Sequence, residues 1–206
     1  KKITKKELAE MASKIEIDIL KNPIGKQDQY AATFGGFKSY KFFRGNKVLV
    51  KKLKSHSLKN IFNNSVFIWI GNFKESKIIL NQQMKEIPNK IKLYKDLLNL
   101  VKFSKSLIQK GKFNLIQFGE LLNKNWSLKK QLSNNITNPK IDKLYSECLK
   151  IGAIGGKVLG AGSGGFLLMV IKKNEKEKLI RKLKSKKVYS FLNSAKGVEV
   201  IHKKFY

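Results

Sequence analysis

The chain has 206 residues, of which 44 are Lys or Arg and 14 are Asp or Glu, so its formal net charge is +30 at pH 7. A hydrophobic fraction of 42% with 10% aromatic residues is enough to form a core, which excludes a disordered basic tail. The longest apolar runs are far shorter than the roughly 20 residues that a membrane-spanning helix needs, so we expect no membrane association. The single cysteine, Cys148, cannot form an internal disulfide, which suits a reducing compartment and predicts a cytoplasmic protein.

The first part of the chain has the pattern of a helix followed by strands. Thr4 and Glu7 are spaced as in a capping box, which predicts a helix that begins at once and ends at Pro23. Residues 47–53 alternate apolar and basic side chains, as a half-buried strand does. Residues 66–70 form a short apolar run, which is typical of a buried strand.

The rest of the chain has the pattern of several helices followed by strands. Periodicity predicts helices at about 75–86, 89–109, 113–133 and 139–151, the last with Asn138 as its cap. The elements expected after a glycine-rich stretch are a strand at 166–171, a helix at 175–185 capped by Asn174, and strands at 188–191 and 198–202. Because helices and strands are mixed without a regular βαβ repeat, the predicted fold class is α+β.

The charge of +30 by itself suggests nucleic-acid binding, because a basic surface releases counterions from phosphates. Nearly all of the positive residues are lysines, with Arg44 and Arg181 the only arginines, and they are spread along the chain. Proteins that read bases rely mostly on Arg. The charge therefore favours compositional bias and a solvated surface, and a non-catalytic, basic nucleic-acid-binding domain remains as an alternative.

A first candidate motif lies at residues 25–36, Gly-Lys-Gln-Asp-Gln-Tyr-Ala-Ala-Thr-Phe-Gly-Gly. Asp28 lies in a polar turn and could accept a proton from a substrate hydroxyl held close to it. The alternative is that Asp28 caps the helix that follows. Glu16, earlier in the chain, is either a magnesium ligand or a solvated surface acid.

A second candidate motif lies at residues 155–165, Gly-Gly-Lys-Val-Leu-Gly-Ala-Gly-Ser-Gly-Gly. So many glycines indicate positive φ angles or a close approach to the main chain, and the N–H groups of such a loop can bind phosphate. The stretch lacks the Gly-Lys-Ser/Thr of a Walker loop and the strand, turn and helix order of a dinucleotide fingerprint. The alternative is a tight connection into a buried strand.

Together these residues resemble the GHMP superfamily of small-molecule kinases. The stretch 118–130, Phe-Gly-Glu-Leu-Leu-Asn-Lys-Asn-Trp-Ser-Leu-Lys-Lys, followed by residues 152–166, resembles the D-glycero-D-manno-heptose 7-phosphate kinase branch in particular. The resemblance implies ATP- and Mg²⁺-dependent phosphoryl transfer to a sugar hydroxyl, with the anomeric hydroxyl of a heptose 7-phosphate as the expected acceptor. It implies a sugar phosphate and ATP as ligands and disfavours nucleic acid. Another kinase of the superfamily, with a galactose-, fucose- or mevalonate-like substrate, remains an alternative.

The resemblance also implies roles for individual residues. Asp28 would orient or deprotonate the acceptor hydroxyl, and Glu16 would bind Mg²⁺. The loop expected beside the phosphates consists of Gly160, Ala161, Gly162, Ser163, Gly164 and Gly165. The expected substrate contacts are Gln29, Tyr30, Lys74 and Lys157. For Tyr30, a packing role is an equal alternative.

Two features depart from the family pattern. Where the family has Gly-x-x-Arg after the strand predicted at 66–70, this chain ends the same element with Lys74, which keeps the charge without the bidentate fork of Arg. The family's nucleotide loop, of the form Pro-x-x-x-Gly-Leu-Gly-Ser-Ser-Ala, is absent upstream of the first helix. The chain therefore resembles the carboxyl-terminal portion of a kinase, and we expect it to bind ATP poorly and to turn over little by itself.

The resemblance divides the chain into two domains. Residues 1–56 are expected to be the remainder of an amino-terminal domain like domain 2 of ribosomal protein S5. Residues 57–206 are expected to form a ferredoxin-like GHMP kinase carboxyl-terminal domain. The polar connection at 58–64, before the strand at 66–70, is consistent with this boundary.

Overall fold

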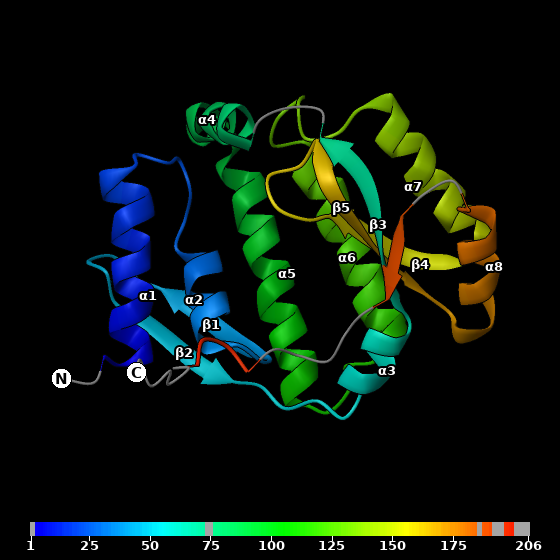
Figure 1. Cartoon of the computed structure of the whole chain (residues 1–206), viewed down its shortest axis with the longest axis horizontal. Coiled ribbons are helices and arrows are strands. Elements are labelled where there is room, and N and C mark those ends of the chain that lie inside the picture. Colours follow the sequence, from blue (N-terminus) through cyan, green and yellow to red (C-terminus); the bar gives the residue numbers. More distant parts are fainter. Residues whose placement is uncertain (1–2, 73–75, 185–186, 191–195, 200–206) are drawn as a thin grey trace, which may run out of the picture. The chain divides into compact units, whose positions relative to one another are not determined.

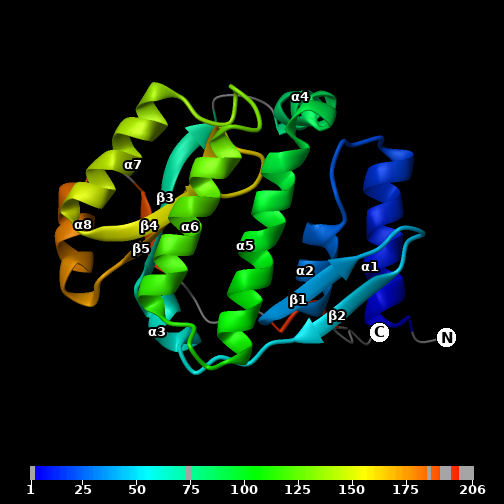
Figure 2. The same cartoon turned by 180° about the vertical axis from the view of Figure 1, so that it is seen from behind.

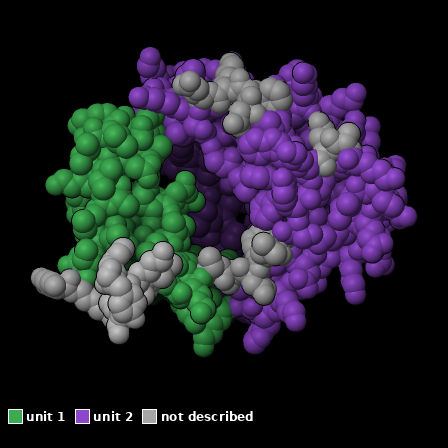
Figure 3. All heavy atoms as spheres, viewed as in Figure 1, with its two compact units in different colours: residues 1–54, 193–206 green, residues 55–192 purple. Residues whose placement is uncertain are grey.

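The computed structural model describes residues 3–72, 76–184, 187–190 and 196–199. The chain divides into two units, residues 1–54 with 193–206 (unit 1) and residues 55–192 (unit 2), coloured separately in Figure 3. The division after residue 54 lies close to the predicted domain boundary, but the structure groups the carboxyl-terminal residues with unit 1. The mixture of helices and antiparallel sheets confirms the predicted α+β class.

Unit 1 begins with a helix that the sequence predicts well. Helix α1 (Lys5–Lys14) has the expected capping box, in which Glu7 donates its N–H to the Thr4 hydroxyl and Thr4 donates its N–H to the Glu7 carboxylate. The helix does not run regularly to Pro23, because residues Ile15–Ile19 form a π-helical turn, η1. Helix α2 (Gln27–Phe34) packs on α1.

A two-stranded sheet follows in unit 1. Strand β1 (Lys38–Phe42) pairs antiparallel with β2 (Val48–Lys52), which confirms the strand predicted at 47–53. The turn between them has positive φ at Gly45 and Asn46. β1 lies outside the sequence predictions, because its short alternation of lysine with serine and aromatic residues gives no clear apolar face.

Unit 2 contains a four-stranded antiparallel sheet (Figure 1). Its strands are β3 (Ser65–Asn72), β4 (Ala153–Val158), β5 (Gly164–Ile171) and β6 (Val188–Ser190), in the spatial order β4-β5-β3-β6. Helices lie between β3 and β4 and between β5 and β6, so the chain follows the βαββαβ order of ferredoxin-like folds. The sequence analysis expected residues 155–165 to form a glycine-rich loop. The structure corrects this expectation, because residues 155–158 belong to strand β4.

The helices of unit 2 largely confirm the predictions. They are α3 (Leu58–Asn63), α4 (Ser76–Glu86), the 3-10 turn η2 (Pro88–Lys90), α5 (Ile91–Gln109), α6 (Leu115–Lys130), α7 (Pro139–Ile151), the 3-10 turn η3 (Lys173–Glu175) and α8 (Lys176–Lys182). Asn138 caps α7 as predicted, with its side chain accepting the N–H of Ile141 at 3.0 Å. No helix among the described residues is both long and apolar enough to cross a membrane.

Three predictions in unit 2 and at the end of the chain need correction. Helix α3 replaces the polar connection expected before β3. Asn174 lies within η3 and does not cap α8, whose capping residue is Glu175. Of the strand expected at 198–202, Val198 and Glu199 are not in a strand, and the other residues lie outside the described part of the chain.

Helices α6 and α7 both pack against β4, the edge strand of the unit 2 sheet (Figures 1 and 2), and α5 packs against α6. One face of the sheet contributes the completely buried residues Val66, Ile68, Val158, Leu167, Met169 and Ile171 to a core that also contains residues of α7 and α8. α6 approaches β4 closely because both elements carry glycine at the contact. A Cβ atom added to Gly155 would lie 2.1 Å from the carbonyl oxygen of Gly119. This contact places the carboxyl-terminal end of α6 alongside the end of β4.

Candidate active site

A glycine-rich turn joins β4 to β5, within residues 159–163. Its backbone has positive φ at Gly160 (+68°), Gly162 (+116°) and Ser163 (+58°), so the glycines there meet a conformational requirement. Gly164 and Gly165, which were predicted to belong to the loop, instead begin strand β5.

The turn packs on the segment between α6 and α7. Ser163 donates its N–H to the carbonyl of Ile136 at 2.7 Å. A Cβ atom on Gly162 would lie 2.7 Å from the same oxygen, so no larger residue fits without movement. Two side chains also donate to the turn, Lys129 Nζ to the carbonyl of Gly160 and Gln83 Nε2 to that of Ala161 at 3.4 Å. The conformation of the turn is therefore specified from several sides.

Two lysines meet beside this turn. Lys157 is the penultimate residue of β4 and Lys129 lies in the last turn of α6, and both are partly buried. Burial lowers the pKa of Lys129 to about 7, and the positive charge of Lys157 adds to this effect. Burial also lowers the pKa of Lys157. Lys157 was among the predicted substrate contacts, whereas the sequence gives no sign that Lys129 differs from the other surface lysines.

Replacing Lys157 with methionine should raise the pKa of Lys129 above about 7, because one of the two causes that depress it is the neighbouring positive charge. The pKa can be followed by an NMR titration of the lysine side-chain signals. Lys124→Met, at an exposed position on α6, removes the same charge and should leave the pKa of Lys129 unchanged. An equal shift in both variants would show that the Lys157 charge has no specific effect.

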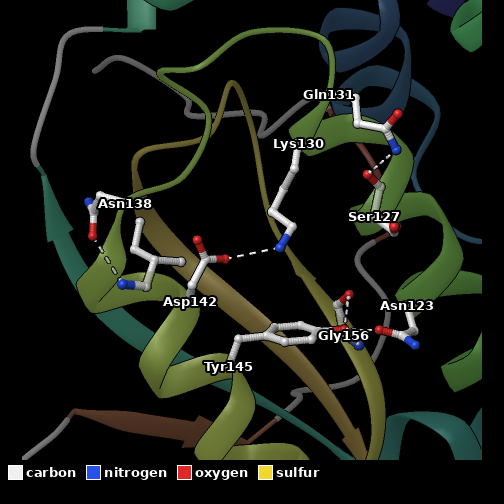
Figure 4. Close-up of polar contacts among 9 residues, drawn as sticks. Asn123, Ser127, Lys130, Gln131, Asn138, Asp142, Tyr145 and Gly156 are labelled. Carbon is white, nitrogen blue, oxygen red and sulfur yellow. Dashed lines mark hydrogen bonds and ion pairs between the residues drawn. The ribbon is translucent and has the colours of Figure 1, made fainter.

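The buried side chain of Tyr145, on α7, contacts both α6 and β4 (Figure 4). The hydroxyl of Tyr145 donates to Asn123 Oδ1 at 2.7 Å and accepts the N–H of Gly156 at 3.1 Å. Burial raises the pKa of Tyr145 to about 12, so the hydroxyl keeps its proton at neutral pH. Lys130 and Asp142 form an ion pair at 3.1 Å, which joins α6 to α7 a short distance away.

Replacing Tyr145 with phenylalanine should lower the free energy of unfolding by about 1–3 kcal/mol, because the buried N–H of Gly156 loses its acceptor. Chemical denaturation followed by circular dichroism measures the change. Tyr189→Phe is a suitable control, since that side chain is 48% exposed. Equal stability of the two variants would contradict a structural role for the Tyr145 hydroxyl.

The first predicted motif lies in unit 1. Asp28 is exposed in the first turn of α2, and Lys26 occupies the N-cap position without a side-chain capping hydrogen bond, so the alternative in which Asp28 caps the helix is not what the structure shows. Gln29 follows it, 7% exposed, and donates its Nε2 to Glu16 Oε1 at 2.7 Å. This hydrogen bond holds Glu16, in the π-helical turn, beside the helical turn that carries Asp28.

Tyr30 is completely buried in unit 1. Its ring stacks on Phe34 with centroids 6.0 Å apart and meets the edges of Tyr40 and Phe42. Burial raises the pKa of Tyr30, and the negative charge of Glu10 adds to the effect. These contacts favour the packing role for Tyr30 over the substrate role.

Lys74 and the metal-binding candidate Glu16 are the remaining predicted site residues. Lys74 lies outside the described residues. Within the described part of the chain, no group of three or more His, Cys, Asp and Glu side chains is arranged to hold a metal ion. A single carboxylate such as Glu16 is nevertheless compatible with Mg²⁺, which usually binds proteins through one or two carboxylates together with substrate phosphates.

The glycine-rich turn lies within a segment that matches a known protein family. Residues 105–189, which include α6, α7, the turn, β4, β5, α8 and the start of β6, match the family profile "GHMP kinases C terminal". This segment is therefore similar to the C-terminal domain of GHMP kinases.

Among curated proteins, the D-glycero-alpha-D-manno-heptose 7-phosphate kinase of Campylobacter jejuni is 29% identical over 188 residues, or 89% of this chain. This chain spans 55% of the length of that kinase. The L-fucokinase/L-fucose-1-P guanylyltransferase of Bacteroides fragilis is also 29% identical, over 77% of this chain and 17% of its own length. Both of these relatives are named as sugar kinases.

Solved structures of kinases share the fold. A D-glycero-D-manno-heptose 1-phosphate kinase from Bacteroides thetaiotaomicron superposes with a TM-score of 0.62 at 23% identity, covering 97% of this chain and 57% of that structure. The mevalonate kinase of Methanococcus jannaschii superposes with a TM-score of 0.67 at 20% identity, covering 94% of this chain and 58% of that structure. At these identities the likeness concerns the fold.

Proposed function

We propose that this chain acts in a GHMP-family sugar kinase that transfers phosphate from ATP to the anomeric hydroxyl of a heptose 7-phosphate. The observation that carries the proposal is the similarity to the Campylobacter jejuni heptose 7-phosphate kinase over 89% of the chain. That extent exceeds unit 2, so it includes residues of both units. We propose a cytoplasmic location for two reasons. The proposed reaction uses ATP and a sugar phosphate, and the buried thiol of Cys148 is free, as is usual in a reducing compartment.

The described residues supply groups that this reaction needs. Phosphoryl transfer requires mainly positioning and neutralisation of charge, and Mg²⁺ bound with ATP supplies much of that neutralisation. Glu16 would hold the metal through its carboxylate, whose Oε1 is oriented by Gln29. Asp28, exposed at the start of α2, would accept the proton of the acceptor hydroxyl. Lys157 and the turn at 160–163 would bind negatively charged oxygen atoms of the ligands.

The proposal is tested by measuring phosphate transfer from ATP to D-glycero-D-manno-heptose 7-phosphate. The assay compares the chain alone with a chimera in which the unmatched part of the Campylobacter jejuni kinase is joined to it. We expect the chimera to form a heptose 1,7-bisphosphate and the chain alone to turn over little. Galactose, fucose and mevalonate serve as competing acceptors. A chimera that folds and binds ATP but phosphorylates none of the heptose would refute the assignment.

A further inference from the structure

We propose that Lys129 and Lys157, together with the backbone N–H groups of the turn at 160–162, form a binding site for the dianion of a phosphate monoester. The identity of the molecule that carries this phosphate rests on the proposed kinase function. The anion site itself is a property of unit 2 that can be tested without turnover.

The two lysines converge because of how α6 and β4 pack. Alternate residues of a strand point to the same face, so the side chain of Lys157 lies on the same face as the Cβ direction of Gly155. That face meets α6, because a Cβ atom on Gly155 would lie 2.1 Å from the Gly119 carbonyl oxygen and 2.8 Å from the side chain of Asn123. Lys129 lies further along the same helix and donates its ammonium group to the carbonyl of Gly160.

The charge of this pair is not balanced within the described residues. Neither Lys129 nor Lys157 has a carboxylate oxygen within 4.0 Å there. The neighbouring Lys130 differs, because it pairs with Asp142 at 3.1 Å. Two partly buried ammonium groups repel each other unless an anion lies near both. A phosphate dianion compensates both charges, and lysine is a common phosphate ligand.

The turn supplies further donors beside the lysines. Among the described residues, no backbone carbonyl accepts a hydrogen bond from the N–H of Gly160, Ala161 or Gly162. The left-handed conformation at Gly160 and Gly162 is of the kind that forms anion-binding concavities from successive N–H groups. The lysines and the turn therefore offer charge and directed hydrogen bonds at one place in the fold.

Two molecules of the proposed reaction carry such a group, the acceptor sugar through its phosphate and ATP through its terminal phosphate. The shared chemistry is a phosphate with two negative charges. Binding measurements with each molecule distinguish these sources, and uncharged heptose should not compete for the site.

The test uses the intact 206-residue chain and side-chain NMR signals of the lysines. Inorganic phosphate, heptose 7-phosphate and ATP without metal are titrated separately. Sulfate, which keeps its two charges over the neutral range, serves as a probe independent of ligand protonation. We expect saturable shifts of the Lys129 and Lys157 signals with phosphate and sulfate. The molecule that binds at least tenfold more tightly than inorganic phosphate is the source of the bound group.

Matched variants decide whether the two lysines form the site. Lys129→Gln and Lys157→Gln should each weaken phosphate binding about tenfold or more, whereas Lys129→Arg should retain most of it. Lys124→Gln removes the same charge from an exposed position of α6 and should change affinity less than twofold. Thermal unfolding confirms that each variant is folded. Unchanged affinity in both lysine variants, or shifts spread evenly over exposed lysines, would overturn the proposal. An inactive chimera that still binds phosphate through these lysines would reject the kinase function and keep the anion site.

Discussion

Replacing Asp28 with asparagine should lower kcat of the active chimera by roughly 10²- to 10⁴-fold, the usual contribution of a group that transfers a proton. Asparagine has nearly the same size and cannot accept the proton of the acceptor hydroxyl. Asp28 is exposed, so its replacement disturbs no packing, and loss of a carboxylate from the first turn of α2 costs only about 0.3–1 kcal/mol of stability. The dissociation constant for ATP should change little.

Initial rates with heptose 7-phosphate and a separate ATP-binding measurement distinguish a catalytic effect from a binding effect. Asp18→Asn is the matched control, because Asp18 is another exposed acid of unit 1, located in the π-helical turn. It should keep kcat within a small factor of the parent enzyme. If Asp28→Asn retains the parent kcat, Asp28 is not the proton acceptor.

Replacing Gly162 with alanine should lower the free energy of unfolding of unit 2 by about 3 kcal/mol. This value combines the cost of a positive φ for alanine with the steric clash of the added methyl group. The φ of Gly162 is +116°, and the added methyl group would lie 2.7 Å from the Ile136 carbonyl oxygen, which also accepts the N–H of Ser163. Relief of the clash therefore requires movement of the whole turn. We expect phosphate binding at Lys129 and Lys157 to weaken in parallel.

Gly160→Ala separates the two causes. Gly160 also has positive φ, +68°, but no atom lies within 4 Å of an added Cβ. Only the backbone penalty of about 1–2 kcal/mol should remain in this variant. Denaturant titrations of both variants measure the difference. If Gly160→Ala is as destabilising as Gly162→Ala, contact with the Ile136 segment does not determine the conformation of the turn.

Local signals in the sequence predict much of the secondary structure correctly. The capping box of Thr4 and Glu7 and the Asn138 cap are interactions between residues three positions apart, so they form as soon as the helix does. The apolar run at 66–70 forms part of β3, in which Val66, Ile68 and Ile70 are buried, whereas Trp69 on the other face is 36% exposed. Strand β4 lacks such a signal, because Gly155 admits α6, Gly156 lies against Leu168 and Met169 of β5, and glycine has a low strand propensity.

The sequence by itself determined the helices with strong caps, the apolar strands and the two glycine-containing motifs with their family resemblance. Only the tertiary structure decided that Tyr30 is buried among aromatic rings, that Gln29 orients Glu16, and that Lys129 meets Lys157. The physical reason is distance along the chain. Caps and periodicity are encoded within a few residues, whereas the lysine pair exists only because α6 and β4, far apart in sequence, pack through Gly119 and Gly155.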